Sequence, residues 1–401
     1  IYRLFFLMLF CFFSEVFFCQ EKNILESIFN QNSNSLVGKI YQQRKKYRLK
    51  VILTEVSRSM ENTLQTKEFK AGITEEIYFN PASLVKLPVS VMALEKINSL
   101  KDYGVAVDSR IEFDSAFACQ TAMKFDETSS NRFASVEHFI KKMLLVSDNE
   151  AYNRIFEFLG TESIAKKLTL WGASNSAIVQ RFTAECDSVM NTYANPYRFL
   201  NEKGEIIYQE GLRCFNRAYR NPLNAMIGKA YIDHRNKLVK KPRDFSHANF
   251  LPLEFINKLL TLIIFPSLQD KDIKLNLVEK DYKFMREFLK KTPYESITPV
   301  YDKKKFPDNY KKYYLPDDFL TNSFFEGVEV YNIVGRSHGF ISDCSYFFDK
   351  NSGVEFFLSA VLYVNEDGVI NDGKYEYNSI GLPFLRQLGM AVLRYERKKH
   401  R

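Results

Sequence analysis

Residues 78–96 read YFNPASLVKLPVSVMALEK and begin with a polar break at Asn80-Pro81. An apolar run follows, and because proline is well accepted in the first turn of a helix, the stretch predicts a buried helix that begins near Pro81. Ser83 and Lys86 then lie one turn apart on one face, where the amine can reach the hydroxyl. Unpaired N–H groups at a helix N-terminus also stabilise developing negative charge. This arrangement is typical of a nucleophilic serine, although Ser-x-x-Lys spacings also occur by chance on solvated helix surfaces.

The segments around this helix predict an α/β fold of the α+β kind. Helical and strand periodicities alternate along the chain as follows: a helix in 22–43, a strand in 47–56, a less regular strand-bearing segment at 73–79, helices at 136–146, 150–160, 163–170, 253–264 and 281–290, strands at 327–334, 339–348 and 354–364, and a helix at 380–395. We therefore expect an antiparallel sheet flanked by N- and C-terminal helices, with an inserted all-helical domain. The predicted boundaries are a signal peptide at 1–19, a sheet domain at 22–105 plus 326–401, and an inserted mainly helical domain at 106–325.

Composition and charge are those of a folded globular protein. The chain has 401 residues, of which 46% are hydrophobic and 26% charged, and its 36 Phe and 23 Tyr argue against disorder. The net charge is +8, but its basic clusters are dispersed and lack a motif of stacking aromatics, so no nucleic-acid partner is predicted. In an exported protein, this mild positive charge would favour anionic polymers of the cell envelope.

The first twenty residues differ from the rest of the chain. Arg3 precedes the ten apolar residues LFFLMLFCFF, which fits a secretory signal peptide and is too short to span a bilayer. We expect cleavage near Cys19-Gln20 and therefore a periplasmic protein without a membrane segment. The alternatives are an uncleaved anchor, because small residues for cleavage are scarce, and a lipid on Cys19, although the bulky Phe18 argues against that.

Six cysteines are present, two of them in the N-terminal segment. Cys119, Cys186, Cys214 and Cys344 are scattered without a C-x-x-C pair, so their spacing predicts neither a zinc site nor a disulfide framework. Export would permit a disulfide bridge, but the sequence cannot assign one. We expect these cysteines to be mostly small buried residues. The sequence has no H-E-x-x-H and no G-x-x-x-x-G-K-[ST], so no metal and no nucleotide cofactor is expected.

Two further motifs follow the serine-lysine pair in order. Ser-Asp-Asn at 147–149 lies in a predicted loop between helices, and Gly335 lies on a late strand. This set resembles the class A β-lactamase and penicillin-binding-protein superfamily of serine hydrolases, whose signatures are S-x-x-K, S-D-N and K-T-G. SDNEAYN at 147–153 resembles the family's S-D-N-x-A-x-N, and VGRSHGFISDCSYFFD at 334–349 resembles its third strand turning into the fourth.

The resemblance is good over 40–185 and 326–398 and weak over 196–325, where this chain is much longer than compact β-lactamases. It is similar to the divergent class-A-like serine hydrolases of Gram-negative bacteria related to Bacteroides. The resemblance implies that Ser83 attacks a carbonyl and forms an acyl-enzyme, and that Lys86 takes or relays its proton. It implies further that Ser147 passes a proton to the leaving nitrogen and that Asn149 binds the substrate amide and Lys86. The N–H groups of Ser83 and Arg336 would form the oxyanion hole.

Two departures from the family pattern bear on turnover. Alignment of Gly335 puts Ile333 at the position of the K-T-G lysine, whose charge serves the substrate carboxylate and the second serine. Gly335, Arg336 and Ser337 are expected to line the substrate site. Arg336 or His338 are candidate replacements for the lysine, but a plain strand-end arginine and a packed histidine are equally compatible with the sequence.

The second departure concerns the glutamate that activates the deacylating water in class A enzymes. Glu185, in the segment 181–185 with Asn195 nearby, is the local candidate, although the spacing is not the family's and a surface glutamate is the plainer interpretation. Without such a base, the acyl-enzyme would form but hydrolyse slowly.

These observations favour a serine hydrolase of the class A β-lactamase type, an activity that confers antibiotic resistance. Its expected partner is a small β-lactam or peptidoglycan-like substrate, and a monomer is expected. The alternatives are a penicillin-binding-like peptidase or esterase with slow deacylation, and a non-catalytic envelope-binding protein with the same fold. The Ser-Asp-Asn motif as a simple turn remains the structural alternative for 147–149.

Overall fold

The computed structural model describes residues 23–73, 75–116, 119, 121–182, 186–215, 219–269 and 273–400. The predicted signal peptide at 1–19, with Cys19, and the candidate base Glu185 lie outside these residues. Within the described ranges, no helix combines the length and the apolar character that a bilayer crossing requires.

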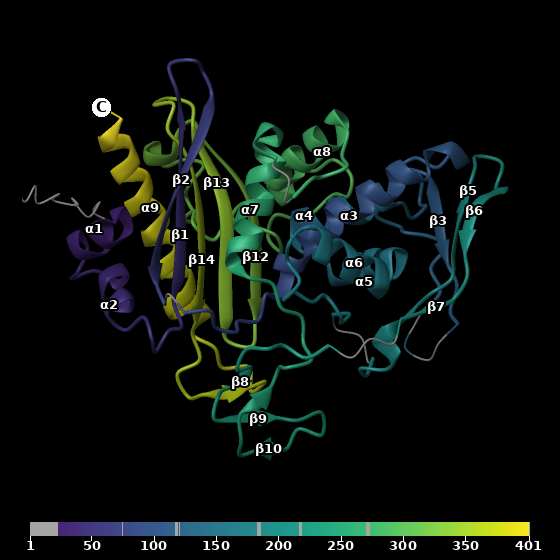
Figure 1. The fold of residues 1–401 in the computed structure, drawn as a ribbon, viewed down its shortest axis with the longest axis horizontal. Helices are drawn as coiled ribbons and strands as arrows, with labels where there is room; N and C mark the ends of the chain where they lie inside the picture. The colour runs from purple at the N-terminus through teal and green to yellow at the C-terminus, as the bar shows by residue number, and fades with distance from the viewer. Residues whose placement is uncertain are drawn as a thin grey trace, which may run out of the picture.

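A five-stranded antiparallel sheet forms the centre of the molecule, in the order β12-β13-β14-β1-β2 (Figure 1). Its strands are β1 (Lys50–Arg58), β2 (Leu64–Gly72), β12 (Val328–Ser337), β13 (Phe340–Asp349) and β14 (Glu355–Tyr363). The early strand and the three late strands confirm the periodicity argument. The strand expected at 73–79 is wrong, because the ladder with β1 ends at Gly72 and the chain then leaves the sheet for the helix that follows Pro81.

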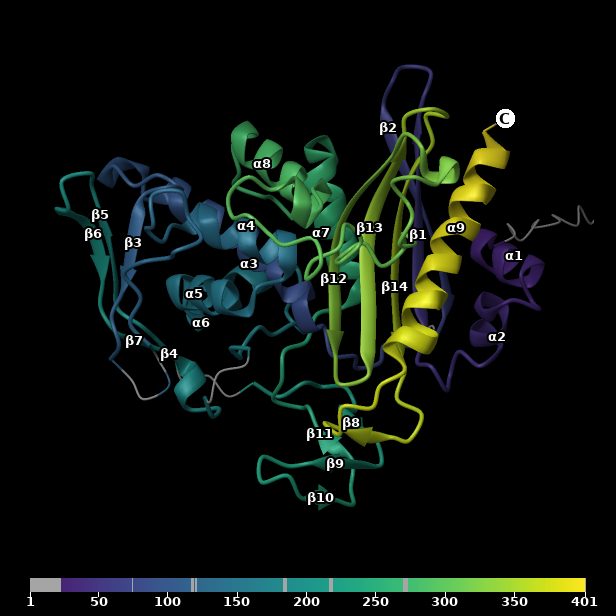
Figure 2. The same cartoon turned by 180° about the vertical axis from the view of Figure 1, so that it is seen from behind.

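Helices cover both faces of this sheet, as Figures 1 and 2 show. One face carries the terminal helices α1 (Ile24–Gln31), α2 (Leu36–Gln42) and α9 (Leu382–Lys399), and the other carries α3 (Lys86–Ser99), α7 (Leu253–Ile264) and α8 (Glu279–Lys290). Neighbouring strand residues serve opposite cores: Leu53 lies in the cluster beneath the terminal helices and Ile52 in the cluster beneath α3 and α7. The expected sheet with flanking terminal helices is confirmed.

The inserted region is not all-helical, and that expectation needs correction. It contains α4 (Val136–Val146), α5 (Asn149–Leu159) and α6 (Thr161–Leu170), but also a small sheet of β3 (Arg110–Phe113), β5 (Tyr197–Leu200) and β6 (Ile206–Glu210). A second group of short strands comprises β8 (Met226–Ile227), β9 (Ala230–Ile232), β10 (Leu238–Val239) and β11 (Arg243–Asp244), to which β15 (Val369–Ile370) adds from the C-terminal part. Strands of two to five residues are too short for a hydrophobic alternation to reveal them.

The cysteine expectation also needs correction. Cys119 and Cys186 form a disulfide across a sequence separation of 67 residues, Cys214 is exposed, and only Cys344 is the small buried residue that was expected. Sequence spacing could not pair the first two, because their proximity depends on how the loop after β3 and the loop after residue 182 meet.

Candidate active site

Ser83 lies in a tight 3-10 turn, Ala82–Val85, that leads directly into α3. The Asn80 side-chain oxygen accepts from the Ala82 N–H at 2.9 Å, and the Leu84 N–H donates to the Pro81 carbonyl at 2.9 Å. Ala82 has a φ of +45°, a left-handed conformation that costs a non-glycine residue about 1–3 kcal/mol. The surrounding hydrogen bonds therefore hold the backbone in a strained conformation immediately before Ser83, which itself is only half-buried.

The amine of Lys86 is the centre of the polar contacts around Ser83. Lys86 Nζ lies 3.0 Å from Ser83 Oγ, 3.0 Å from Ser147 Oγ and 2.8 Å from Asn149 Oδ1, and it also donates to the Ser147 carbonyl. Three predicted motif residues, one from the turn before α3 and two from the junction of α4 and α5, therefore converge on one nitrogen. A neutral amine there can accept a proton from one hydroxyl and return it to the other.

Burial of Lys86 allows its amine to be neutral near pH 7. The Lys86 side chain is fully buried, and desolvation lowers its pKa from 10.5 to about 7, while the negative charge of Asp148 opposes the shift. A lysine in water is almost entirely protonated at this pH and could not act as a base.

The loop that carries Ser147 consists of two helix caps joined end to end. Ser147 ends α4 in the left-handed conformation with φ +59°, and Asp148 begins α5 by accepting the Ala151 N–H at 2.8 Å. The predicted cap at the other end of α4 is confirmed, since Ser135 Oγ accepts the His138 N–H at 3.1 Å. Because α4 ends and α5 begins within this loop, its backbone is held by both helices, and its side chains have little freedom to move away from Lys86.

Gly335 places the edge strand β12 against the Ser83 turn. A Cβ on Gly335 would lie 2.5 Å from the Pro81 carbonyl oxygen and 2.7 Å from Ser342 Oγ, so only glycine allows this approach. The strand alternation then turns the side chain of Arg336 to the opposite face, where its guanidinium lies 5.5 Å from the Tyr377 ring. Only the backbone of Arg336 faces the site region.

Ser337 and His338 follow at the end of β12. Ser337 shares the face of Gly335 by alternation, and its hydroxyl lies 2.6 Å from His338 Nδ1. Burial, together with the positive charge of Arg243, lowers the pKa of His338 to about 4. His338 is therefore neutral at pH 7 and does not supply the positive charge that the Ile333 position lacks.

An aromatic ring covers the remaining side of the Lys86 amine. The Phe182 ring centroid lies 5.4 Å from Lys86 Nζ and stacks on the Tyr152 ring at 4.4 Å. The Phe182 backbone is held by Asn153, whose Oδ1 accepts the Phe182 N–H at 2.8 Å and whose Nδ2 donates to the Phe182 carbonyl at 2.9 Å. Phe182 thus occupies a fixed position where the segment 181–185 comes closest to the amine in the described chain.

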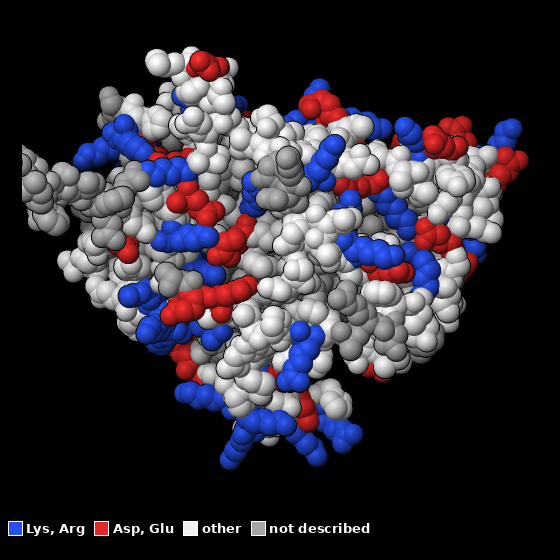
Figure 3. Space-filling view, viewed as in Figure 1, with Lys and Arg blue, Asp and Glu red and all other residues white. Residues whose placement is uncertain are grey.

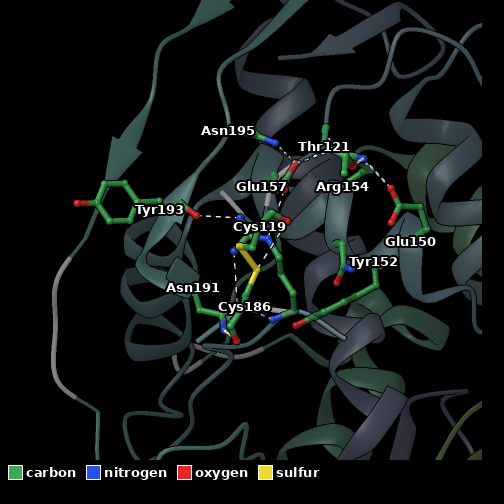
Figure 4. A network of polar contacts seen from close by, with 12 residues as sticks. Cys119, Thr121, Glu150, Tyr152, Arg154, Glu157, Cys186, Asn191, Tyr193 and Asn195 are labelled. Atoms are coloured by element: carbon green, nitrogen blue, oxygen red, sulfur yellow. Dashed lines mark hydrogen bonds and ion pairs between the residues drawn. A yellow bond between two sulfur atoms is a disulfide. The ribbon is translucent and has the colours of Figure 1, made fainter. Parts of the chain in front are cut away.

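A buried network of ion pairs and hydrogen bonds lies next to this segment (Figure 4). The Glu157 carboxylate lies 3.2 Å from Arg154 and 3.3 Å from Arg181, and it accepts from Asn195 Nδ2 at 3.1 Å. The Cys119–Cys186 disulfide lies beside this network in the same view. Asn195, which the sequence placed near a deacylating base, therefore binds Glu157 as a structural partner.

The described residues contain no group of three or more His, Cys, Asp or Glu side chains placed to hold a metal ion. The polar side chains that converge on the Lys86 amine are two serines and an asparagine, which suit proton transfer and hydrogen bonding.

Comparisons with known proteins agree with this geometry. Residues 47–205 match a family model described as the Beta-lactamase enzyme family. A β-lactamase from Burkholderia vietnamiensis superposes with a TM-score of 0.50 at 12% identity, over 94% of this chain and 98% of that one. Residues 47–205 are therefore similar to this enzyme family, and the chain shares the fold of that β-lactamase.

Two further solved structures are similar at a lower level. They are a β-lactamase from Xanthomonas campestris (12% identity, 90% of this chain and 98% of that one, TM-score 0.47) and the structure of PBP-A (13% identity, 91% and 97%, TM-score 0.48). No curated protein matches the chain by sequence.

An arginine from the inserted region lies beside the end of β12. Arg243 lies with its guanidinium 5.3 Å from the Phe245 ring, and that ring lies 5.1 Å from the ring of His338. Its charge also contributes to the lowered pKa of His338. A cation is therefore present near the site although Ile333 itself, buried in the core behind the Ser83 helix, carries none.

Sequence reasoning did not identify Phe182, Asn153 or Arg243. The SDNEAYN motif includes Asn153, so its last asparagine was the available signal for a residue that fixes a neighbouring segment. Nothing in the sequence around Arg243 indicated that it lies near the end of β12, because the two are far apart in the sequence.

Proposed function

We propose that this protein is a serine hydrolase acylated at Ser83 by β-lactam or peptidoglycan-like peptide amides, with slow release of the acyl group. The observation that carries the proposal is the convergence of Ser83, Ser147 and Asn149 on the buried amine of Lys86. The family-model match over residues 47–205 supports a serine hydrolase, and the slow release rests on the residues around Lys86.

Acylation follows from the distances. Neutral Lys86 accepts the proton of Ser83 Oγ at 3.0 Å while that oxygen attacks the substrate carbonyl carbon. As the C–N bond breaks, Ser147, which lies 3.0 Å from the same amine, delivers a proton to the leaving nitrogen and is reprotonated by Lys86. The N–H groups of Ser83 and Arg336 would stabilise the oxyanion, and each such donor is worth about 3–4 kcal/mol.

The position of the sheet supports an amide in an extended conformation as substrate. β12 is an edge strand, so one side of its backbone is open to pair with an added chain. Arg243 offers a positive charge for a substrate carboxylate near the strand end.

Deacylation is the step that the geometry does not favour. Hydrolysis of the acyl-enzyme needs a base that activates water beside Ser83. The ring of Phe182 lies over Lys86, and this apolar face excludes water from one side of the amine. Glu185, the predicted base, lies outside the described residues, and fast turnover through it is the competing proposal, a true β-lactamase.

The test is an incubation with a chromogenic cephalosporin, followed by the intact mass of the protein. We expect a lasting adduct of one acyl group that Ser83→Ala abolishes, with colour release limited to about one equivalent. Phe182→Glu should shorten the lifetime of the adduct, because it places a carboxylate beside Lys86, whereas Phe182→Leu should not.

The other outcomes assign the protein differently. Rapid continuous colour without a lasting adduct, lost in Glu185→Gln, would establish the β-lactamase reading and with it a role in antibiotic resistance. Absence of both colour and adduct would favour a non-catalytic binding protein. Periplasmic location, expected from residues 1–19, is tested separately by fractionation of cells that express the full chain.

A further inference from the structure

An ion pair that is largely shielded from water lies next to the loop that carries Ser147. Lys142 Nζ, near the C-terminal end of α4, lies 2.9 Å from Asp126 Oδ2 and 3.9 Å from Asp148 Oδ2. Asp126 is buried, and 12% of the Lys142 side chain is exposed. The Lys142 amine is therefore held between two carboxylates, and one of them is the helix cap at which α5 begins.

Asp126 has the hydrogen bonds that a buried carboxylate requires. Its Oδ1 accepts from Thr128 Oγ1 at 2.6 Å and lies 3.7 Å from His138 Nε2, which itself lies 2.8 Å from Thr128 Oγ1. Burial alone would raise the pKa of Asp126, but the hydrogen bonds from these two side chains and from Lys142 outweigh it and hold that pKa below its ordinary value. The Asp126 carboxylate is therefore ionised at pH 7 and draws Lys142 toward itself.

Asp148 connects this ion pair to the amine of Lys86. The Asp148 Oδ1 accepts the Ala151 N–H, and the Asp148 N–H donates to the Lys142 carbonyl at 3.3 Å, so the carboxylate is fixed beside Lys142. Burial lowers the pKa of Lys86, and the negative charge of Asp148 opposes that shift. A cation 3.9 Å from Asp148 Oδ2 offsets part of this negative charge. Lys142 therefore weakens the effect of Asp148 on Lys86.

Two further ionisable groups lie near these residues. Burial, followed by the charges of Asp148 and Asp126, raises the pKa of the Tyr301 hydroxyl, so this group from the segment after α8 stays neutral at pH 7. Arg181, in the segment that places a ring over the amine, lies 3.3 Å from Glu157. On the face shown in Figure 3, Lys and Arg side chains are interspersed with Asp and Glu, and water screens such exposed charges.

We propose that Lys142, held in place by Asp126, is a positioning residue that keeps the Lys86 amine available as a base by offsetting the charge of Asp148. Lys142 and Asp126 lie outside the S-x-x-K and S-D-N motifs. A lysine near the C-terminus of a helix also offsets the helix dipole, but that structural role would change stability without changing the protonation of Lys86. The effect on acylation rests on the proposed function, whereas the protonation of Lys86 can be measured without a substrate.

The test compares the pH midpoint of acylation by a fluorescent penicillin in the wild type and in Lys142→Met. The midpoint should move up by about half a pH unit, so that the rate at pH 6 falls about threefold, because Asp148 then acts on Lys86 without its counter-charge. Lys142→Arg keeps the charge and should keep the wild-type midpoint. The matched control is Lys141→Met, which removes a lysine of the same helix that pairs with Glu137 and should leave the midpoint unchanged.

Variants of Asp126 and Asp148 give results that differ in sign. Asp126→Asn removes the charge that draws Lys142 away from Asp148, so the midpoint should move to lower pH. Lys142→Met alone leaves a buried carboxylate without its cation, which is destabilising. The double variant of Lys142→Met with Asp126→Asn removes the pair together and should still raise the midpoint. In the Asp148→Asn background, Lys142→Met should no longer move the midpoint, because Asp148 has lost the charge through which Lys142 acts.

A second measurement follows the Lys86 amine by NMR in protein labelled with ¹³C at the lysine Cε. The signal that is absent from Lys86→Met reports the Lys86 amine, and its titration midpoint should move in the same directions as the acylation midpoint. An unchanged midpoint in both Lys142→Met and the double variant, or an equal change in Lys141→Met, would overturn the inference. Absence of acylation with the NMR midpoint moved as expected rejects the proposed function alone, and normal acylation with an unmoved NMR midpoint rejects this inference alone.

Discussion

The acylation rate should rise with pH through a midpoint near 7, because only the neutral amine of Lys86 can accept the Ser83 proton. Burial lowers the Lys86 pKa from 10.5 to about 7, so about half of the molecules carry the neutral amine at pH 7. A lysine with the ordinary value would be neutral in only about one molecule in 3,000 at that pH. The shift corresponds to about 5 kcal/mol of desolvation cost borne by the charged form.

The assay is the rate of adduct formation with a fluorescent penicillin between pH 5 and 9, measured by rapid quench and mass spectrometry. Below the midpoint, the rate should increase about tenfold per pH unit, and above it the rate should level off. Lys86→Arg should abolish acylation with the fold intact, because a guanidinium stays protonated throughout this range.

Asp148 provides a sharper control, because its charge raises the pKa of Lys86. Asp148→Asn keeps a helix-capping side chain but removes that charge, so the midpoint should move to lower pH and the rate at pH 6 should increase. Glu150→Gln removes an exposed carboxylate two residues away that pairs with Arg154, and it should leave the midpoint unchanged. A flat profile, a midpoint near 10, or a shift to higher pH in Asp148→Asn would refute the assignment of Lys86 as the base.

Three further predictions follow from contacts outside the proton path. Gly335→Ala would put a Cβ 2.5 Å from a backbone oxygen and should slow acylation at least about tenfold with the secondary structure retained. The control Gly211→Ala, whose Cβ would have nothing within 4 Å, should not change the acylation rate. Normal acylation by Gly335→Ala would contradict the close approach. Replacement of both Cys119 and Cys186 by serine should lower the free energy of unfolding by up to about 4 kcal/mol in denaturant titrations, and an unchanged midpoint would mean that the bridge does not form. Stability should rise with pH between about 7 and 10.5, because the unfolded chain binds protons that the buried amines of Lys312 and Lys86, each with a pKa lowered to about 7, do not. Lys312→Met should reduce the slope of this rise and leave the part due to Lys86, and an identical slope would reject the assignment.

The terminal helices and four of the five sheet strands were predictable because their signals are local. The apolar runs of the strands and the stripe of the last helix depend only on which residues face a core. The cap at Ser135 and the turn before Ser83 likewise depend on side chains within a few residues. β2 was missed because its residues are mostly exposed and polar, so its place in the sheet depends on pairing with β1 rather than on burial.

The candidate site likewise has residues that local sequence signals predicted and contacts that they did not. The motifs identified Ser83, Lys86, Ser147 and Asn149 as a set, because the order and spacing of such residues are written in the chain. The disulfide, the ring of Phe182 over the amine and the position of Arg243 beside β12 were not predictable. These contacts join segments that are distant in sequence.

The sequence by itself therefore indicated the pair of Ser83 and Lys86 and the apolar strands that build the sheet. Only the tertiary structure decided how far the Lys86 amine is shielded from water, which side chain lies over it, and which cation lies near the strand that lacks the expected lysine. The physical reason is that a lowered pKa and a closed disulfide are properties of an enclosed volume. Such a volume exists only once the inserted region has packed against the sheet.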